Sequence, residues 1–175
     1  MEQFFFKKPI LRKSTEKIPV YNSEGVIVCY IQRYFENWIQ RTIDMVLDEL
    51  FIHVKVFNDN NEVMINGKEI LSIKNLVFSK WELKDNDGNL ISLKDKTKIK
   101  TNPRLEFKYK DNEFKLEKDF GDKTTRIRDN RNNIICEIVY DKPIPPSNIT
   151  ISHRDLKSID VFLIVCVYYI FTLRE

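Results

Sequence analysis

Basic side chains gather in one short segment of this 175-residue chain. Residues 94–110 read KDKTKIKTNPRLEFKYK and hold seven basic side chains against Asp95 and Glu106. In an extended backbone, alternate residues project from the same face, so lysines spaced by two form a row. Such a row attracts phosphate groups, and each basic residue near an anionic membrane contributes about 1 kcal/mol. The residues that we predict to bind ligand are Lys94, Lys96, Lys98, Lys100, Arg104, Lys108 and Lys110.

The same pattern has a second interpretation, because lysines on the edge of a strand also prevent aggregation. Overall charge does not decide between the two. The chain has 29 Lys and Arg against 26 Asp and Glu, a formal net charge of +3. This excess is too small to indicate nucleic-acid binding. We therefore expect an anionic membrane surface or a phospholipid headgroup as the partner, and no specific nucleic acid.

The N-terminal segment, residues 1–17, places three phenylalanines, Phe4 to Phe6, beside cations. Aromatic residues next to cations suit a membrane interface. They equally suit an arm whose phenylalanines pack on the rest of the protein, or a disordered tail. We expect an N-terminal arm over 1–17 and a single domain over 18–175. The basic residues of the arm are Lys7, Lys8, Arg12, Lys13 and Lys17.

Residue types that serve catalysis or bind metals are present without the required spacing. His53 and His153 lie in different segments, and residues 152–155 (SHRD) are adjacent, which precludes a triad geometry by themselves. Residues 85–88 (DNDG) resemble the start of a calcium loop, but Gly88 stands fourth instead of sixth and Lys96 occupies the twelfth place. We therefore predict a hairpin turn there, and a protein without catalytic activity, metal or cofactor.

The three cysteines, Cys29, Cys136 and Cys166, are far apart and each lies in an apolar run. An odd number without a CxxC pair argues against disulfides and a zinc site. Buried free thiols are the expected state. The first residues lack the features of a signal peptide. These observations predict a reducing, cytoplasmic location, peripheral at a membrane if the basic row binds lipid.

Most of the chain consists of short alternating segments separated by Asn- and Asp-rich turns, which is typical of successive β-hairpins. Asn66-Gly67 is a strong hairpin signal, and we expect all four glycines to lie in turns that need positive φ. We predict about twelve antiparallel strands. The segments that we identify as strands are 18–21, 26–33, 51–57, 62–65, 76–83, 89–93, 104–110, 113–118, 124–128 and 134–140.

Two segments break this pattern. Residues 35–50 have apolar side chains near helical spacing, which predicts an amphipathic helix with Trp38 on its core face. Residues 161–171 (VFLIVCVYYIF) are apolar throughout. They are too short for a transmembrane helix, which needs about 20 residues, and too long for an ordinary buried strand. We favour a helix over 157–173 that is enclosed by protein, with Asp155 or Ser158 as its cap.

An apolar helix and many hairpins together favour one architecture. About twelve antiparallel strands can close into a barrel wide enough to hold a helix about 10 Å across. Closure also removes most of the exposed strand edges. We therefore predict a mainly β protein, a closed antiparallel barrel around a buried C-terminal helix, with one additional amphipathic helix.

The order of these segments resembles the tubby C-terminal-like superfamily, which includes tubby, the LURP-one-related proteins and the phospholipid scramblases. The resemblance is carried by VYNSEGVIVCYIQR, FKYKDNEFKLEK and IRDNRNNIICEIVYD, followed by IDVFLIVCVYYIF. It implies a twelve-stranded barrel threaded by the C-terminal helix and binding of anionic phospholipid headgroups. The function that we predict is a non-catalytic module that binds such headgroups or another phosphate-bearing ligand at the basic surface. The alternative function is a protein-interaction or structural module without a small ligand.

Overall fold

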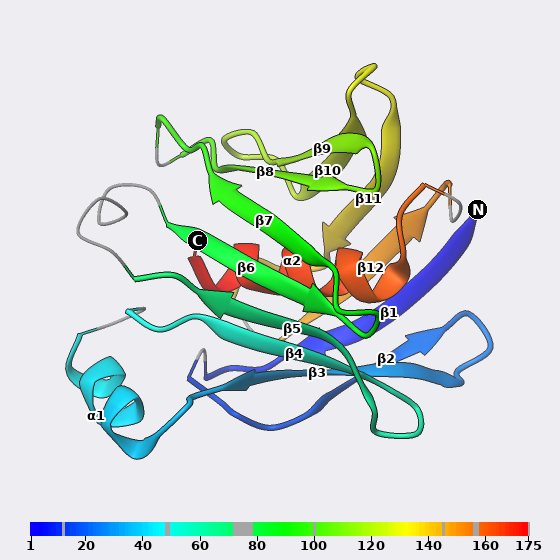
Figure 1. Ribbon diagram of the computed structural model, residues 1–175. Coiled ribbons are helices and arrows are strands. Elements are labelled where there is room, and N and C mark those ends of the chain that lie inside the picture. The colour runs from blue at the N-terminus through cyan, green and yellow to red at the C-terminus, as the bar shows by residue number, and fades with distance from the viewer. Residues whose placement is uncertain are drawn as a thin grey trace.

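Twelve antiparallel strands form a closed barrel in the computed structural model, which describes residues 1–11, 13–47, 50–71, 79–99, 101–144, 146–155 and 158–174. The strands are β1 (Glu2–Lys8), β2 (Ile18–Asn22), β3 (Ile27–Tyr34), β4 (His53–Asn58), β5 (Val63–Glu69), β6 (Lys80–Asp85), β7 (Leu90–Asp95), β8 (Arg104–Tyr109), β9 (Asn112–Glu117), β10 (Thr124–Asp129), β11 (Ile134–Tyr140) and β12 (Ser147–His153). The helices are α1 (Trp38–Val46) and α2 (Val161–Arg174). Each strand pairs with its neighbours in sequence, and β1 closes against β12 (Figure 1).

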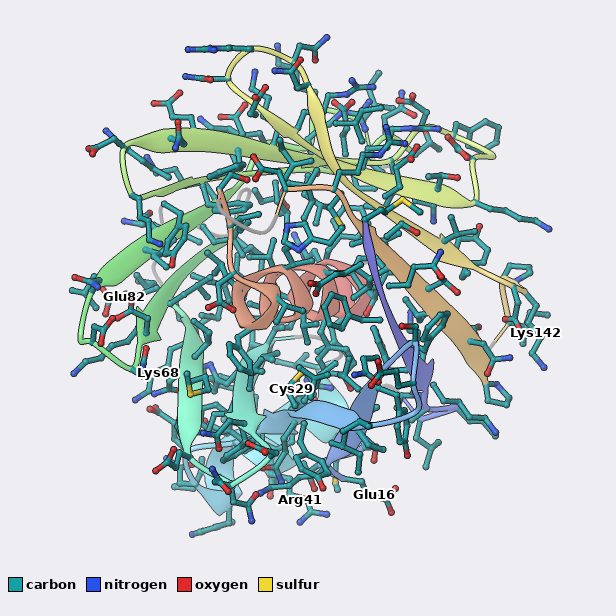
Figure 2. All side chains as sticks on the ribbon, turned by 90° about the vertical axis from the view of Figure 1, so that its right-hand side faces the viewer. Glu16, Cys29, Arg41, Lys68, Glu82 and Lys142 are labelled. Atoms are coloured by element: carbon teal, nitrogen blue, oxygen red, sulfur yellow. The ribbon has the colours of Figure 1, made fainter. Side chains whose placement is uncertain are left out.

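The helix α2 lies inside this barrel, as expected from its apolar sequence. Figure 2 shows α2 at the centre with strands around it. Every residue from Leu163 to Leu173 is buried, and the inward-facing residues of the strands join them in one core. In the described part of the chain, neither helix has the length and apolar character needed to cross a bilayer.

The start of α2 differs from the expectation. The helix begins at Val161, and its cap is Asp160, not Asp155 or Ser158. The Asp160 carboxylate accepts a hydrogen bond of 2.7 Å from the Phe162 N–H, and its carbonyl accepts one of 3.1 Å from the Ile164 N–H. The expected first residue, Lys157, lies outside the described residues.

The N-terminal segment is part of the barrel over residues 2–8 instead of an arm outside it. In β1, Phe4 and Phe6 point into the core, and the strand pairs with β2 and β12. Without β1 the barrel would present two open edges. The phenylalanines therefore complete the wall of the barrel.

The glycine predictions hold at three positions and fail at one. Gly25, Gly88 and Gly121 have positive φ, but Gly67 lies within β5, so Asn66-Gly67 is not a hairpin turn. The chain turns earlier, at residues 59–62, where Asn61 has φ 70° and its N–H donates to the Asn58 carbonyl. A Cβ on Gly67 would lie 2.8 Å from Leu83 Cδ2 and 3.3 Å from Ile170 Cδ1. Gly67 therefore allows the sheet to approach α2.

The helix α1 is turned the opposite way from the prediction. Its buried residue is Asp44, whereas Trp38 is 74% exposed. Arg33 of β3 is also buried, and its guanidinium donates to Asp44 Oδ2 at 2.8 Å and to the Phe51 carbonyl at 2.9 Å. The Phe51 N–H donates to Asp44 Oδ1. This ion pair holds the Asp44 side of α1 against the barrel, so the apolar face of α1 is exposed.

Candidate functional site

The outer face of β7, β8 and β9, with the connector between β7 and β8, carries five of the predicted basic residues. Strand alternation buries Leu93 and Asp95 and leaves Lys94 exposed between them. The pairing register places Lys94 opposite Glu106, and Glu106 opposite Lys115 on the next strand. Lys115 Nζ lies 3.8 Å from Glu106 Oε1. A central carboxylate is therefore flanked by two lysines.

Two adjoining grooves lie on this face, with volumes of about 470 and 220 Å³. They share Lys96, Glu106 and Lys115. The larger groove is lined by Lys96, Lys98, Ile99, Asn102, Arg104, Leu105, Glu106, Lys115 and Glu117. The smaller groove is lined by Ser92, Lys94, Lys96, Glu106, Phe107, Lys108, Glu113, Phe114 and Lys115.

Five of the seven predicted residues line these grooves, namely Lys94, Lys96, Lys98, Arg104 and Lys108. Lys110 does not, because it lies beyond the end of β8 with its ammonium 5.0 Å from the centre of the Tyr109 ring. Lys100 lies outside the described residues. The structure thus brings most of the predicted row to one surface.

Arg104 is already engaged with the protein. Its guanidinium forms an ion pair with Asp119, lies 3.7 Å from a Glu117 carboxylate oxygen, and donates to the Pro103 carbonyl at 3.0 Å. A ligand would have to compete with these partners. Arg104 therefore shapes the groove, whereas the lysines are better suited to contact an anion.

Lys115 is a groove residue that the sequence analysis missed. Alternation along β9 already placed it with Glu113 and Glu117 on the face opposite Phe114 and Leu116. The hairpin register with β8 then brings Lys115 beside Glu106. The missing information was which strands are neighbours.

The charge of the combined grooves is positive but partly compensated. Six basic side chains stand against three glutamates, Glu106, Glu113 and Glu117. The acid Asp95, which lies within the basic segment in sequence, is buried on the other face with its carboxylate 3.5 Å from Arg174. An anion therefore meets an excess of cations on an open surface, where the attraction is weakened by salt.

Three basic residues of the N-terminal segment, Lys8, Lys13 and Lys17, contact the protein itself. Lys8 Nζ donates to the Thr172 carbonyl at 3.3 Å, and Lys13 Nζ donates to the Asp44 carbonyl at 2.8 Å. Lys17 Nζ lies 3.9 Å from the centre of the Phe57 ring. Arg12 lies outside the described residues. These contacts fix the connector between β1 and β2 and do not form one exposed basic surface.

Both histidines are buried, and burial lowers the pKa of each. His53 Nδ1 accepts a hydrogen bond from the Glu69 N–H, and its ring lies against Tyr34. Within the described residues, no group of three His, Cys, Asp or Glu side chains is placed to hold a metal. Each histidine is thus part of the packed interior.

The segment 85–88 forms a hairpin turn, as predicted. The Asp85 carboxylate accepts from the Asn89 N–H at 2.8 Å and from the Asn89 side-chain amide at 2.9 Å. Asp129 makes the same pair of bonds with Asn133 in the turn between β10 and β11. These carboxylates stabilise turns.

The closed barrel and the enclosed C-terminal helix define a class of protein, a helix-threaded β-barrel, which here carries basic grooves on its outer wall. The chain matches the model of the Tubby C-terminal like domain over residues 4–175 and belongs to this family. Searches of curated proteins and of solved structures found no significant match. The family assignment therefore indicates a binding module and leaves its ligand open.

Proposed function

We propose that this protein is a non-catalytic module that binds anionic phospholipid headgroups, or another phosphate-bearing ligand, in the grooves of β7, β8 and β9. The observation that carries the proposal is the convergence of Lys94, Lys96, Lys98, Lys108 and Lys115 on two adjoining grooves. Ammonium groups from three strands and one connector surround a space large enough for a headgroup. Membership of the Tubby C-terminal like domain family supports the same class of function.

The lysines act as point charges in this proposal. A headgroup phosphate would contact several ammonium groups at once and would displace Glu106 from Lys115. Each exposed contact is weak, about 1 kcal/mol near an anionic membrane, so affinity depends on several lysines together. Binding should therefore fall steeply as salt concentration rises. We propose a cytoplasmic protein that is peripheral at an anionic membrane.

Co-sedimentation with vesicles tests the proposal. The protein should bind vesicles of phosphatidylcholine that contain phosphatidylserine and should not bind phosphatidylcholine alone. The double variant Lys96→Glu, Lys98→Glu should abolish binding. The matched control Lys84→Glu, Lys110→Glu changes net charge equally outside the grooves and should retain most of it.

Two results would contradict the proposal: equal behaviour on both kinds of vesicle, or the same loss in the groove variant and its control. Capture of a stoichiometric protein partner without any response to lipid would favour the protein-interaction module instead.

A further inference from the structure

The exposed apolar side chains of this protein are concentrated at one end of the barrel. Because all strand pairs are antiparallel and follow the chain order, successive connectors lie at alternate ends. We define the α1 end by the described residues of the connectors after odd-numbered strands, which are 9–11, 13–17, 35–47, 50–52, 70–71, 79, 96–99, 101–103, 118–123, 141–144 and 146. The turn end comprises the described residues 23–26, 59–62, 86–89, 110–111, 130–133, 154–155 and 158–160. Figure 1 shows α1 and the C-terminus at the first end and the N-terminus at the second.

Of the seventeen exposed large hydrophobic side chains among the described residues, eleven lie at the α1 end. They come from all six connectors, so the apolar surface is spread over separate connectors and is not one groove. We call these exposed apolar side chains the apolar tips. Single exposed hydrophobic residues are common on proteins, but five of these eleven, Trp38, Ile39, Met45, Val46 and Leu47, lie together on α1 and its C-terminal cap. The eleven are Ile10, Leu11, Trp38, Ile39, Met45, Val46, Leu47, Leu71, Ile99, Phe120 and Ile144.

The fold holds α1 in the orientation that exposes its apolar face. The buried pair of Arg33 and Asp44 fixes the polar side against the barrel, and Lys13 donates to the carbonyls of Asp44 and Met45. These contacts also place the connector that contains Ile10 and Leu11 next to α1. The exposure of Trp38 is therefore built into the packing.

The two ends also differ in charge, and the α1 end, which carries most of the exposed apolar side chains, is the more positive one. The described connectors of the α1 end carry eight basic residues, Lys13, Lys17, Arg41, Lys96, Lys98, Lys118, Lys123 and Lys142, against six acidic residues, one of which is the buried Asp44. Those of the turn end carry three basic residues, Lys110, Arg131 and Arg154, against seven acidic residues. An anionic surface attracts the α1 end and repels the turn end.

The larger groove opens at the α1 end. Its lining includes Lys98 and the exposed Ile99 of the connector between β7 and β8. The Phe120 N–H donates to the Asn102 side chain at 2.9 Å, which joins a second apolar tip to that connector. Lysines that could bind a headgroup phosphate thus lie beside apolar side chains that could enter the acyl region of a bilayer.

We propose that the α1 end inserts its apolar tips into the interface of an anionic bilayer, with the barrel standing on that end. The inference deepens the proposed function, on which it rests for the electrostatic attraction. Tips on separate connectors form a convex, irregular surface, which a fluid bilayer accommodates without a matching shape. Tryptophan prefers this interface, and tryptophan, phenylalanine and leucine are typical of apolar faces that enter it. Buried apolar area with cationic charge sets the strength of such binding.

The test measures binding of the full chain to phosphatidylcholine–phosphatidylserine vesicles. Val46→Asp with Ile10→Asp, two exposed residues of the α1 end that line neither groove, should weaken binding tenfold or more. Val26→Asp with Leu90→Asp is the matched control in and beside the turn end, since Leu90 is 63% and Ile10 68% exposed, and it should bind like the wild type. Trp38 fluorescence should shift to the blue on binding, whereas Trp81 is already fully buried.

The outcomes separate this inference from the proposed function. If the groove variant Lys96→Glu, Lys98→Glu loses binding while Val46→Asp with Ile10→Asp does not, insertion is refuted and the groove stands. If only the apolar variants lose binding, insertion is supported and the groove is refuted. If Val46→Asp converts a dimer into a monomer without changing vesicle binding, a second copy covers this end and the inference is overturned.

Discussion

At Gly67, a single hydrogen atom in place of a methyl group allows β5 to approach α2. Gly67→Ala should lower the free energy of unfolding by about 1–3 kcal/mol, the usual effect of overpacking a core. The new methyl group would meet Leu83 Cδ2 at 2.8 Å and Cys166 Sγ at 3.4 Å. Urea denaturation measures the change.

A second substitution isolates the steric cause. Leu83→Val removes the Cδ2 atom, so the double variant with Gly67→Ala should lose less stability than the sum of the two single variants. Additive losses would show that the glycine serves another purpose than close approach.

His153 should make stability depend on pH. The side chain is fully buried in β12, opposite Glu2 and Cys136 in the pairing register. Burial lowers its pKa below 6.5, and the nearby Asp155, Glu2 and Asp160 only partly oppose this. The native state therefore keeps the ring neutral at a pH where the unfolded chain takes up a proton.

Stability from neutral His153 is fully present above pH 6.5. It is lost as the pH falls below that value, by at most about 1.4 kcal/mol per pH unit, until the lower native pKa is reached. His153→Leu removes this proton uptake. The difference in the free energy of unfolding between the wild type and the variant should therefore shift against the wild type as the pH falls from 7.5 to 5.5. Urea denaturation at both pH values tests this, and an unchanged difference would contradict the assignment.

At the scale of an element, α1 depends on one buried ion pair. Arg33→Met leaves the Asp44 carboxylate buried without its cation, and we expect a loss of about 3–5 kcal/mol in the free energy of unfolding. The double variant Arg33→Met, Asp44→Leu should recover much of that loss, because two apolar side chains need no compensation. Denaturation of both variants distinguishes an ion pair from simple packing, for which the double variant would be no better.

At the scale of the whole molecule, α2 serves as the core that the barrel encloses. Val165→Asp should prevent folding, because an unpaired charge in the interior costs several kcal/mol, a large part of an ordinary domain's total stability. Val46→Asp is the matched control: Val165 is 0% exposed and Val46 80% exposed. Circular dichroism and solubility provide the readout, and a folded Val165→Asp protein would contradict the enclosed position of α2.

Much of this architecture follows from local patterns in the chain. Asp85 with Asn89 and Asp129 with Asn133 stabilise the turns between strands that alternation had predicted. The strands β1 and β12 were not identified, because neither is part of a hairpin that local turn chemistry reveals. The closure of the barrel is a pairing between distant segments. Gly67 was misassigned for the same reason, since a close contact with α2 leaves no local signal.

The amphipathic pattern of α1 predicted a helix but not the face that it buries. The deciding contact is with Arg33, which is on β3 and outside the helical pattern. For the groove, alternation predicted the exposure of Lys94 and Lys108, whereas Lys115 required the register between β8 and β9. Lys110 was misplaced because β8 ends at Tyr109.

The three cysteine thiols are buried in separate elements, Cys29 in β3, Cys136 in β11 and Cys166 in α2. Burial raises the pKa of Cys29 and Cys136 to about 12 and also raises that of Cys166. At neutral pH almost no thiolate forms, and an alkylating reagent reaches sulfur only when the surrounding structure opens. The rate at which each cysteine is alkylated therefore measures how often its surroundings open. One experiment would report on β3 through Cys29, on β11 through Cys136 and on α2 through Cys166.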